Sequence, residues 1–488
     1  MNGRRAFKSE ESFLEKISVG AIGTRKVFED MARKGHSPIE LERGSMSFKI
    51  WKEIKIKRVR VPDILCVTCG KRIESRAKTK LEITMSHSFS TPERGWDFGL
   101  DDNDYIAFVR CIKAGDRPID WKADDMVQYV SVHSMRDAYG KDHVISEKPK
   151  GATEGFEARI TWPSSIANSD GVVTFVDSSK LQYKRTSDNR TVTLSLTKQG
   201  IKLQPLVKIG EKLSENQIVA SIVPVVESFD CHKVTSEKYY AEMLKSASLS
   251  DRYVAAKALS FFPTDSTIEK LTHKMNDQKE HVYIRLEAAS SLLKMGNEQT
   301  IFFFEKLLKD YYLENRLECV IALGEIDRHE SCKLLIGTLV DPNQHSEIRA
   351  GAAWSLGELK NKKAMEALVK VFNEVEASIK REAARALVRF GEDYTEDIIR
   401  FIPTSNEEQR AGVAWALSKS GQFQVSDLIS VMVDDEARKW IAWIVGTQNE
   451  ARYINQIEQL KMEDKEVYFA VTVLWKLLSS WVYGLEVY

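Results

Sequence analysis

VPDILCVTCGKRIESRAKTKLEITMSH, residues 61–87, is the stretch that decides how the N-terminal part of the chain is expected to fold. Apolar and polar residues alternate on both sides of Cys69-Gly70, where turn chemistry interrupts the pattern. This arrangement predicts two antiparallel strands joined by a tight turn, with Thr68 facing Lys71 across it. We therefore expect a β-hairpin at residues 61–87.

The predicted hairpin gathers charged side chains onto one of its surfaces. In this register Asp63 faces Arg76 on the neighbouring strand, and Glu74 lies one diagonal step from Asp63. Lys78 follows on the same face, because strand side chains alternate with a period of two. Two carboxylates beside two cations suit metal-assisted cleavage of a phosphodiester, in which the acids hold Mg²⁺ and a cation steadies the phosphate.

Pro62-Asp63 followed by Glu74 on the next strand resembles the motif of the PD-(D/E)xK nucleases. The resemblance covers about twenty-five residues and implies an α/β nuclease-like domain in which Asp63 and Glu74 bind Mg²⁺. The family places a lysine two residues after the second acid, whereas this chain has Arg76 there and its nearest lysine is Lys78. Because arginine stays protonated, Arg76 is expected to hold phosphate rather than accept a proton.

A further acid precedes the hairpin. HSPIELERGS, residues 36–45, predicts a short extended run that carries Glu40 and Glu42 on one face. Nucleases of the suspected type often use an extra acid ahead of the aspartate, and Glu40 or Glu42 fits that role, with Glu40 taken as the candidate. The alternative is that both acids are solvated beside Arg43.

Basic residues are concentrated around the hairpin. Residues 48–80 contain eleven Lys or Arg against three Asp or Glu, an excess of eight positive charges. Residues 54–61 alternate apolar and basic positions, which predicts either an edge strand protected by charge or a track for phosphates. We favour the phosphate track. Its candidate nucleic-acid-binding residues are Lys55, Lys57, Arg58, Arg60, Lys71 and Arg72.

Cys66 and Cys69 have the spacing of half a zinc knuckle. A tetrahedral zinc site needs four ligands, and the sequence contains no second pair at such a spacing. Zinc would therefore require His87 or Cys111 to fold back onto the turn. The alternative, which we favour, is a turn with two incidental thiols.

Residues 151–230 are β-rich in character. Short runs of alternating residues are separated by turn residues such as Ser-Asp-Asn and Gly-Glu-Lys. LQPLVKIGEKLSENQIVASIVP, residues 203–224, resembles the glycine-turn signature of barrel-sandwich domains. The modified-lysine motif of the carriers in that group is absent. We therefore expect a compact β module used for packing or positioning.

Residues 236–488 carry an internal repeat. Arginines recur at Arg252, Arg285, Arg316, Arg349, Arg381, Arg410 and Arg438, 28 to 33 residues apart. Each precedes a helix rich in small residues, which lets neighbouring helices approach closely. The pattern resembles HEAT repeats of the short, PBS-lyase-like type and predicts an α-solenoid. We interpret the recurring arginine as a contact to the preceding turn; a ladder that reads phosphates is the alternative.

The length of 488 residues fits three domains, which we place at 1–150, 151–230 and 236–488. Together they predict a multi-domain α+β protein: a nuclease-like domain, a barrel-sandwich-like module and a HEAT-like solenoid. Six scattered cysteines indicate a reducing compartment. The absence of a signal-peptide pattern at the start and of a long apolar run predicts a cytoplasmic protein without a membrane span.

Two functions from different classes follow. The first is Mg²⁺-dependent cleavage or processing of DNA in defence or repair, with the solenoid holding a partner protein or the duplex. The second is a non-catalytic scaffold for protein or nucleic-acid partners, in which the ions of the hairpin are surface ion pairs. A phycobilin-lyase-like enzyme is a third possibility and rests on the repeats alone.

Overall fold

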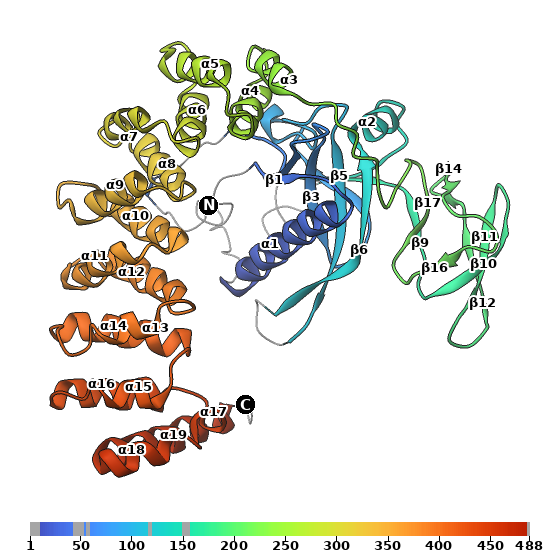
Figure 1. Cartoon of the computed structure of the whole chain (residues 1–488). Coiled ribbons are helices and arrows are strands. Elements are labelled where there is room, and N and C mark those ends of the chain that lie inside the picture. The colour runs from blue at the N-terminus through green and yellow to red at the C-terminus, as the bar shows by residue number, and fades with distance from the viewer. Residues whose placement is uncertain (1–9, 42–52, 55–58, 116–119, 149–156, 486–488) are drawn as a thin grey trace, which may run out of the picture. The chain divides into compact units, whose positions relative to one another are not determined.

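The computed structural model describes residues 10–41, 53–54, 59–115, 120–148 and 157–485. It divides the chain into two compact units. The first contains residues 1–48 and 58–270, and the second contains residues 49–57 and 271–488. The protein thus mixes helix and sheet, with a helical C-terminal region (Figure 1).

A five-stranded sheet with the order β1-β2-β3-β5-β6 forms the centre of the first unit. Its strands are β1 (Pro38–Glu40), β2 (Ile64–Cys66), β3 (Arg72–Lys78), β5 (Tyr105–Lys113) and β6 (Trp121–Ser131). The pair β3–β5 is parallel and the other pairs are antiparallel. Helix α1 (Glu10–Arg33) covers one face of this sheet (Figure 1), and its Val27 and Met31 share an apolar core with the strands.

The predicted hairpin exists, but the predicted register is wrong. Ile64 pairs with Ile73, and Cys66 N–H donates to Lys71 O at 2.9 Å, so the loop contains four residues instead of two. Gly70 closes it with a φ of +74°, a conformation that a side chain would strain. Continued by one residue, this register puts Asp63 opposite Glu74 rather than Arg76.

A second, three-stranded sheet in the same unit has the order β4-β8-β7. Its strands are β4 (Ile83–His87), β7 (Ile145–Glu147) and β8 (Ala158–Trp162), and helix α2 (Val132–Gly140) and the short turn η2 (Pro92–Arg94) lie in this part of the chain. Ile83, Ile160 and Trp162 are fully buried in the core that this sheet shares with α2.

The β-rich stretch that follows forms three small sheets around a core of its own. Its strands are β9 (Ser164–Ile166), β10 (Gly171–Val176), β11 (Lys180–Arg185), β12 (Thr191–Ser195), β13 (Thr197–Lys198), β14 (Ile201–Lys202), β15 (Gln204–Pro205), β16 (Lys212–Leu213) and β17 (Ile218–Ser221). Val173, Leu181 and Tyr183 are buried at its centre.

The chain then returns to the five-stranded sheet and enters the first helices. Tyr129 and Val226 exchange backbone hydrogen bonds of 2.7 and 2.9 Å, and the ring of Phe229 stacks on Tyr105 with centroids 4.6 Å apart. Helices α3 (Glu237–Met243) and α4 (Leu249–Ala258), with η3 (Leu259–Phe261), belong to this first unit. Arg72 Nη1 of β3 donates to Asp251 of α4 at 2.7 Å, so the first helical pair is joined to the sheet.

The second unit consists of helices stacked in pairs (Figure 1). They are α5 (Asp265–Asn276, which begins in the first unit), α6 (Val282–Lys294), η4 (Glu298–Thr300), α7 (Ile301–Leu307), α8 (Leu313–Leu323), α9 (His329–Val340), α10 (Ser346–Leu359), η5 (Lys362–Ala364), α11 (Met365–Lys370), η6 (Val371–Asn373), α12 (Ala377–Phe390), α13 (Thr395–Ile399), α14 (Glu407–Ser420), α15 (Val425–Ile429), α16 (Asp435–Gly446), α17 (Glu450–Tyr453), α18 (Ile457–Glu463) and α19 (Lys465–Leu485). A Cβ on Gly324 would lie 2.7 Å from Ser355 Cβ, so small residues do bring neighbouring repeats together.

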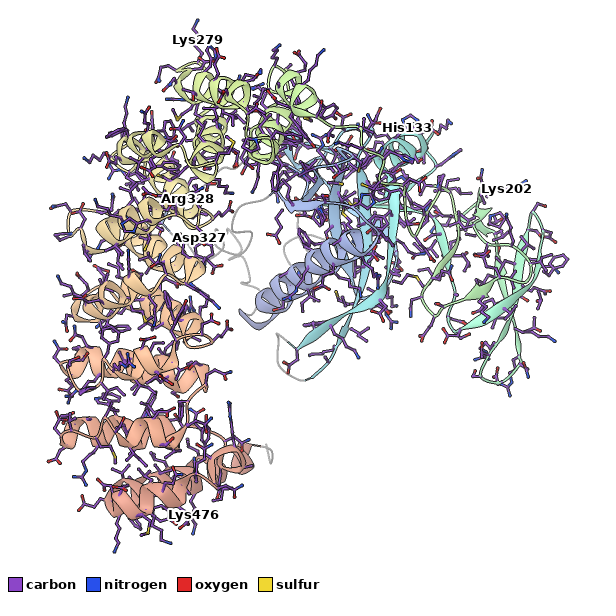
Figure 2. All side chains as sticks on the ribbon, in the orientation of Figure 1. His133, Lys202, Lys279, Asp327, Arg328 and Lys476 are labelled. Atoms are coloured by element: carbon purple, nitrogen blue, oxygen red, sulfur yellow. The ribbon has the colours of Figure 1, made fainter. Side chains whose placement is uncertain are left out.

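The recurring arginine is confirmed as a structural residue in most of the repeats. Arg285, Arg349 and Arg410 each donate through Nε, at 2.8 Å, to a carbonyl at or just after the end of the preceding helix. Arg252 and Arg316 also donate to carbonyls of the preceding turn. Outside the periodic set, Arg328 makes a further link by donating to Lys294 O at 2.9 Å (Figure 2).

Arg349 and Arg410 also reach forward into the next repeat. Arg349 pairs with Glu374 at 2.6 Å, and Arg410 pairs with both carboxylate oxygens of Asp434 at 2.7 and 2.8 Å. Arg438 departs from the pattern, because its guanidinium pairs with Asp464 and Glu466. Each buried guanidinium thus joins two repeats.

Within the described residues, no helix is long and apolar enough to cross a membrane.

We expect Arg410→Met to destabilise helices α14 and α16 locally by about 2 kcal/mol, because a buried carbonyl and Asp434 lose their donor. The measurement is hydrogen exchange of the amides in these helices, which reports local stability in a chain that need not unfold in one step. The matched control is Arg381→Met, because Arg381 is exposed. Equal protection in both variants would contradict the structural role of Arg410.

Candidate functional site

The two acids predicted to bind metal are both engaged by groups of β3. Asp63 Oδ2 accepts a hydrogen bond from Ser75 N at 2.7 Å, at the point where β2 and β3 separate. Glu74 Oε1 pairs with Arg76 Nη2 at 2.6 Å along the same strand face. Both contacts hold the hairpin in shape, whatever further role the carboxylates have.

Asp63 and Glu40 open onto one cavity of about 550 Å³. Its other lining residues belong to α1: Ala21, Thr24, Arg25, Phe28 and Glu29. Neither Glu74 nor Lys78 lines this cavity. In the described part of the chain, the three predicted acids are not close enough together to form one group of metal ligands.

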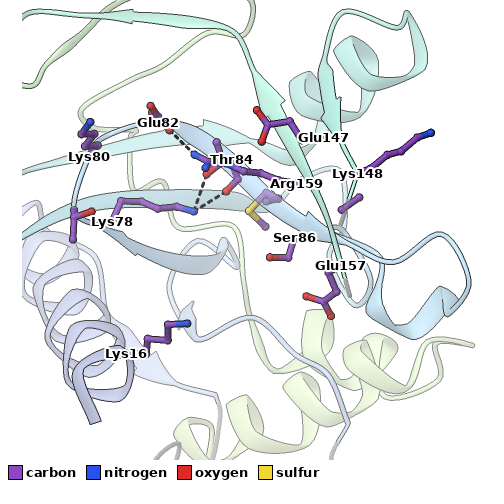
Figure 3. A pocket seen from close by; sticks show the side chains of 13 residues that line it. Lys16, Lys78, Lys80, Glu82, Thr84, Ser86, Glu147, Lys148, Glu157 and Arg159 are labelled. Atoms are coloured by element: carbon purple, nitrogen blue, oxygen red, sulfur yellow. Dashed lines mark hydrogen bonds and ion pairs between the residues drawn. The ribbon is translucent and has the colours of Figure 1, made fainter. Parts of the chain in front are cut away.

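Lys78 lines a different cavity, of about 730 Å³, together with Lys16 of α1 and Arg159 of β8 (Figure 3). Its Nζ donates to the carbonyl and the hydroxyl of Thr84, both at 2.9 Å. Burial lowers the pKa of Lys78 to about 8, and the positive charges of Arg76 and Arg159 act in the same direction. The ammonium group is therefore directed at Thr84, away from the cavity that Asp63 lines.

The predicted nucleic-acid-binding residues are dispersed. Lys55, Lys57 and Arg58 lie outside the described residues. Arg60 donates to Glu93 O at 3.1 Å, and Lys71 donates to Asn103 O at 3.3 Å.

The position of Arg72 does not favour the prediction that this residue contacts nucleic acid. Its side chain is 3% exposed, and its guanidinium donates to Asp104 at 2.8 Å and to Asp251 at 2.7 Å. A guanidinium committed to two carboxylates in the interior is not presented to a phosphate.

The predicted basic strand at residues 54–61 is absent at the positions that the structure describes. Ile54 and residues 59–61 are not in a strand. Ile54 is buried in the apolar core of the second unit. The alternation of apolar and basic residues therefore does not mark a sheet edge at these positions.

Cys66 and Cys69 do lie beside two further side chains that could bind a metal ion. These are His36 and Cys231, and not the expected His87 and Cys111. Cys66 Sγ is 3.7 Å from Cys231 Sγ, and Cys69 Sγ is 3.6 Å from His36 Nδ1. The ligand atoms of all four residues lie within 4.8 Å of one another. We call His36, Cys66, Cys69 and Cys231 the Cys/His cluster.

The two residues that the sequence suggested as further ligands have other partners. Cys111 is buried, and its thiol donates to Val19 O at 3.8 Å. His87 Nδ1 accepts a hydrogen bond from Trp96 N at 3.2 Å. Neither belongs to the Cys/His cluster.

The sulfur atoms of the cluster share hydrogen bonds. A hydrogen bond from the thiol of Cys69 lowers the pKa of Cys66, and the same interaction raises the pKa of Cys69. Ser37 N also donates to Cys66 Sγ at 3.4 Å. The arrangement therefore favours a thiolate at Cys66, which is the metal-binding form of cysteine.

A different kind of site lies in the helical repeats, at the start of α10. Glu347 Oε1 accepts a hydrogen bond from Glu53 N at 3.0 Å, and Oε2 accepts one from Ile54 N at 2.8 Å. His345 Nε2 lies 3.4 Å from Glu53 Oε2. The repeats therefore hold two consecutive residues of the chain by their backbone N–H groups. We call this group the Glu347 site.

We expect the stability of the wild-type protein to rise with pH relative to a Lys78→Met variant. Between pH 8 and the ordinary lysine pKa of about 10.4, the unfolded chain binds more protons at Lys78 than the folded chain does. The gain between pH 7 and pH 9 should be about 1 kcal/mol, measured by denaturant unfolding. Lys80→Met is the control, since Lys80 lines the same cavity but is exposed. Parallel pH profiles for both variants would contradict the lowered pKa.

A family model described as HEAT repeats matches residues 302–387, from α7 to α12. No curated protein matches the chain. One similar solved structure is the complex of CpcE and CpcF of phycocyanin lyase from Nostoc sp. PCC7120, with 17% identity, coverage of 52% of this chain and 100% of that chain, and a TM-score of 0.26. Another is human deoxyhypusine hydroxylase in complex with glycerol, with 15% identity, coverage of 43% and 83%, and a TM-score of 0.19.

A third similar structure is that of computationally designed armadillo repeat proteins for modular peptide recognition, with 17% identity, coverage of 44% and 100%, and a TM-score of 0.22. The family match confirms the predicted HEAT repeats in the helical unit.

Proposed function

We propose that this chain is a non-catalytic scaffold whose HEAT repeats bind a short segment of a protein partner by its main chain. The observation that carries the proposal is the Glu347 site, where one carboxylate accepts the N–H groups of two consecutive residues. The repeats thus already hold two consecutive residues of the chain, and they hold them through the main chain.

The chemistry of the Glu347 site suits recognition of a peptide. Hydrogen bonds to an ionised carboxylate are stronger than those between neutral groups, and two of them fix the direction of the bound backbone. Glu347 itself is 8% exposed, so water competes little for its oxygen atoms. Main-chain hydrogen bonds supply affinity for a chain of any sequence.

The side chain of Ile54 supplies the second element of recognition. It is 6% exposed and belongs to the apolar core of the repeats. Burying an isoleucine side chain contributes about 1.5 to 3 kcal/mol. A backbone clamp beside an apolar core therefore selects a segment whose second clamped residue carries an aliphatic side chain.

The matched family model supports this assignment, because residues 302–387 include all of α10 and the helices on either side of it. Stacked helical repeats form long surfaces that suit extended partners. In this chain, Glu53 and Ile54 act as an internal ligand, and residues 49–57 are grouped with the helical unit.

The proposal predicts that the Glu347 site accepts a peptide in trans once the internal segment is released. We expect Ile54→Asp to weaken the internal contact, because a carboxylate would have to enter an apolar pocket. A fluorescent peptide with the sequence of residues 49–58, KIWKEIKIKR, should then bind the Ile54→Asp variant measurably more tightly than it binds the wild-type chain. Fluorescence anisotropy measures the difference.

Two controls test whether the peptide occupies the same site. Adding Glu347→Ala to the Ile54→Asp chain should abolish the gain, and a peptide that carries aspartate in place of Ile54 should not bind. Equal binding by the single and double variants would overturn the proposal, because the peptide would then be held elsewhere.

Mg²⁺-dependent cleavage of nucleic acid is the second candidate function. The observation in its favour is that Glu40 and Asp63, two of its three predicted acids, line one cavity. Glu74 would have to leave Arg76 and turn toward this cavity to complete a metal site.

Cleavage is tested with Mg²⁺ or Mn²⁺ and supercoiled, linear and single-stranded DNA. Asp63→Asn keeps an acceptor for Ser75 N but removes the charge that a metal needs, so it should lose the activity. Glu29→Gln is the matched control, because Glu29 lines the same cavity and was not predicted as a ligand. Absence of cutting by wild type, or equal cutting by Asp63→Asn, excludes this site.

A further inference from the structure

We propose that His36, Cys66, Cys69 and Cys231 bind one zinc ion that joins three separate segments of the first unit. His36 follows α1, Cys66 and Cys69 belong to the β2–β3 turn, and Cys231 lies in the segment that leads from the β module to α3. This inference is independent of the peptide-binding proposal.

Two distances in the cluster match those expected between ligands of a tetrahedral zinc site. With Zn–S bonds of about 2.3 Å, two sulfur ligands of one ion lie about 3.8 Å apart, and a sulfur and a histidine nitrogen lie about 3.6 Å apart. The observed separations are 3.7 Å for Cys66 Sγ to Cys231 Sγ and 3.6 Å for Cys69 Sγ to His36 Nδ1. These two separations match those of ligands of one zinc ion, and all four ligand atoms lie within 4.8 Å of one another.

The surroundings of His36 prepare the correct nitrogen for a metal. His36 Nε2 lies 3.2 Å from Phe229 O, and a carbonyl oxygen only accepts hydrogen bonds, so the proton belongs on Nε2. The lone pair is then on Nδ1, which is the atom that faces Cys69. A second hydrogen bond that fixes the tautomer is a regular feature of histidine ligands.

The chemistry of the donor set selects zinc. Three thiolates and one imidazole are a common set for structural zinc, whereas Mg²⁺ and Ca²⁺ prefer oxygen ligands. Four protein ligands fill the tetrahedron, so no position is left for a water or a substrate. His36 and Cys66 are also buried, with exposed fractions of 6% and 0%. We therefore assign a structural role to the ion.

The β2–β3 turn in the cluster is also tied to the first helix of the repeats. Val67 O accepts hydrogen bonds from Tyr240 OH at 3.1 Å and from the hydroxyl of Thr235. Thr68 O accepts from the backbone N–H groups of Val234 and Thr235. The ion would thus fix the point at which the chain passes from the β module into α3.

The first experiment is metal analysis of the full-length chain, purified without chelators and with any histidine tag removed. We expect one zinc ion per chain in wild type and in Cys332→Ser, a control whose buried cysteine lies in α9. Cys231→Ser and His36→Ala should lose the zinc. His36→Cys should keep it, because a four-cysteine set also binds zinc.

Two measurements on wild type cover the case in which a ligand variant does not fold. Cobalt supplied in place of zinc should give the absorption bands of a tetrahedral thiolate complex. Titration of the native chain with an organomercurial should release zinc in step with modification of the cluster thiols.

Wild-type chain that contains no zinc and gives no tetrahedral cobalt spectrum would overturn the proposal. So would a Cys66–Cys231 disulfide found by mass spectrometry of the native chain, because one of the ligand pairs would then be consumed. Retention of zinc in both Cys231→Ser and His36→Ala would overturn the assigned ligand set.

Discussion

Burial of guanidinium groups is the constraint on which both units depend. An arginine in the interior must place all its donors on acceptors, because an uncompensated charge there costs several kcal/mol. In the first unit, Arg72 meets this requirement with Asp104 and Asp251 and thereby joins β3 to α4. In the repeats, Arg349 and Arg410 meet it with one carbonyl behind and one carboxylate ahead. The same requirement thus holds the sheet to the first helical pair, and it links neighbouring repeats at Arg349 and Arg410.

This constraint explains why the repeats could be predicted from the sequence, whereas much of the first unit could not. The helical array has a period of about 30 residues, and every repeat carries its own arginine and small residues, so the pattern is local. The ligands of the Cys/His cluster are at positions 36, 66, 69 and 231, and only the middle pair has a recognisable spacing. The predicted hairpin register failed for a related reason, because the loop contains four residues whose backbone groups bond to distant segments: Val67 N–H donates to Ser37 O, and Thr68 O accepts from the N–H groups of Val234 and Thr235. Nothing local in the sequence distinguished that loop from a two-residue turn.

The acids of the hairpin show how a short motif is ambiguous. A carboxylate that accepts a hydrogen bond from a strand N–H and one that binds Mg²⁺ are the same residue type at the same spacing. In this structure Asp63 caps Ser75 N, and Glu74 pairs with Arg76 on its own strand. Both contacts explain why acids stand at these positions without any metal chemistry. The alternation around Ile54 is ambiguous in the same way, since its apolar residue is buried by helices and not by a sheet.

The Glu347 site places its own restriction on any occupant. The carboxylate is almost fully buried, and leaving a buried acceptor without its donors costs about 1 to 3 kcal/mol. The repeats therefore favour a state in which some chain supplies two consecutive N–H groups to Glu347. Proline has no N–H, so a segment with proline at either clamped position cannot satisfy the site. A partner that displaces the internal segment must therefore match its backbone hydrogen bonds and also fill the space that Ile54 occupies, which makes the internal segment a competitor for every external one.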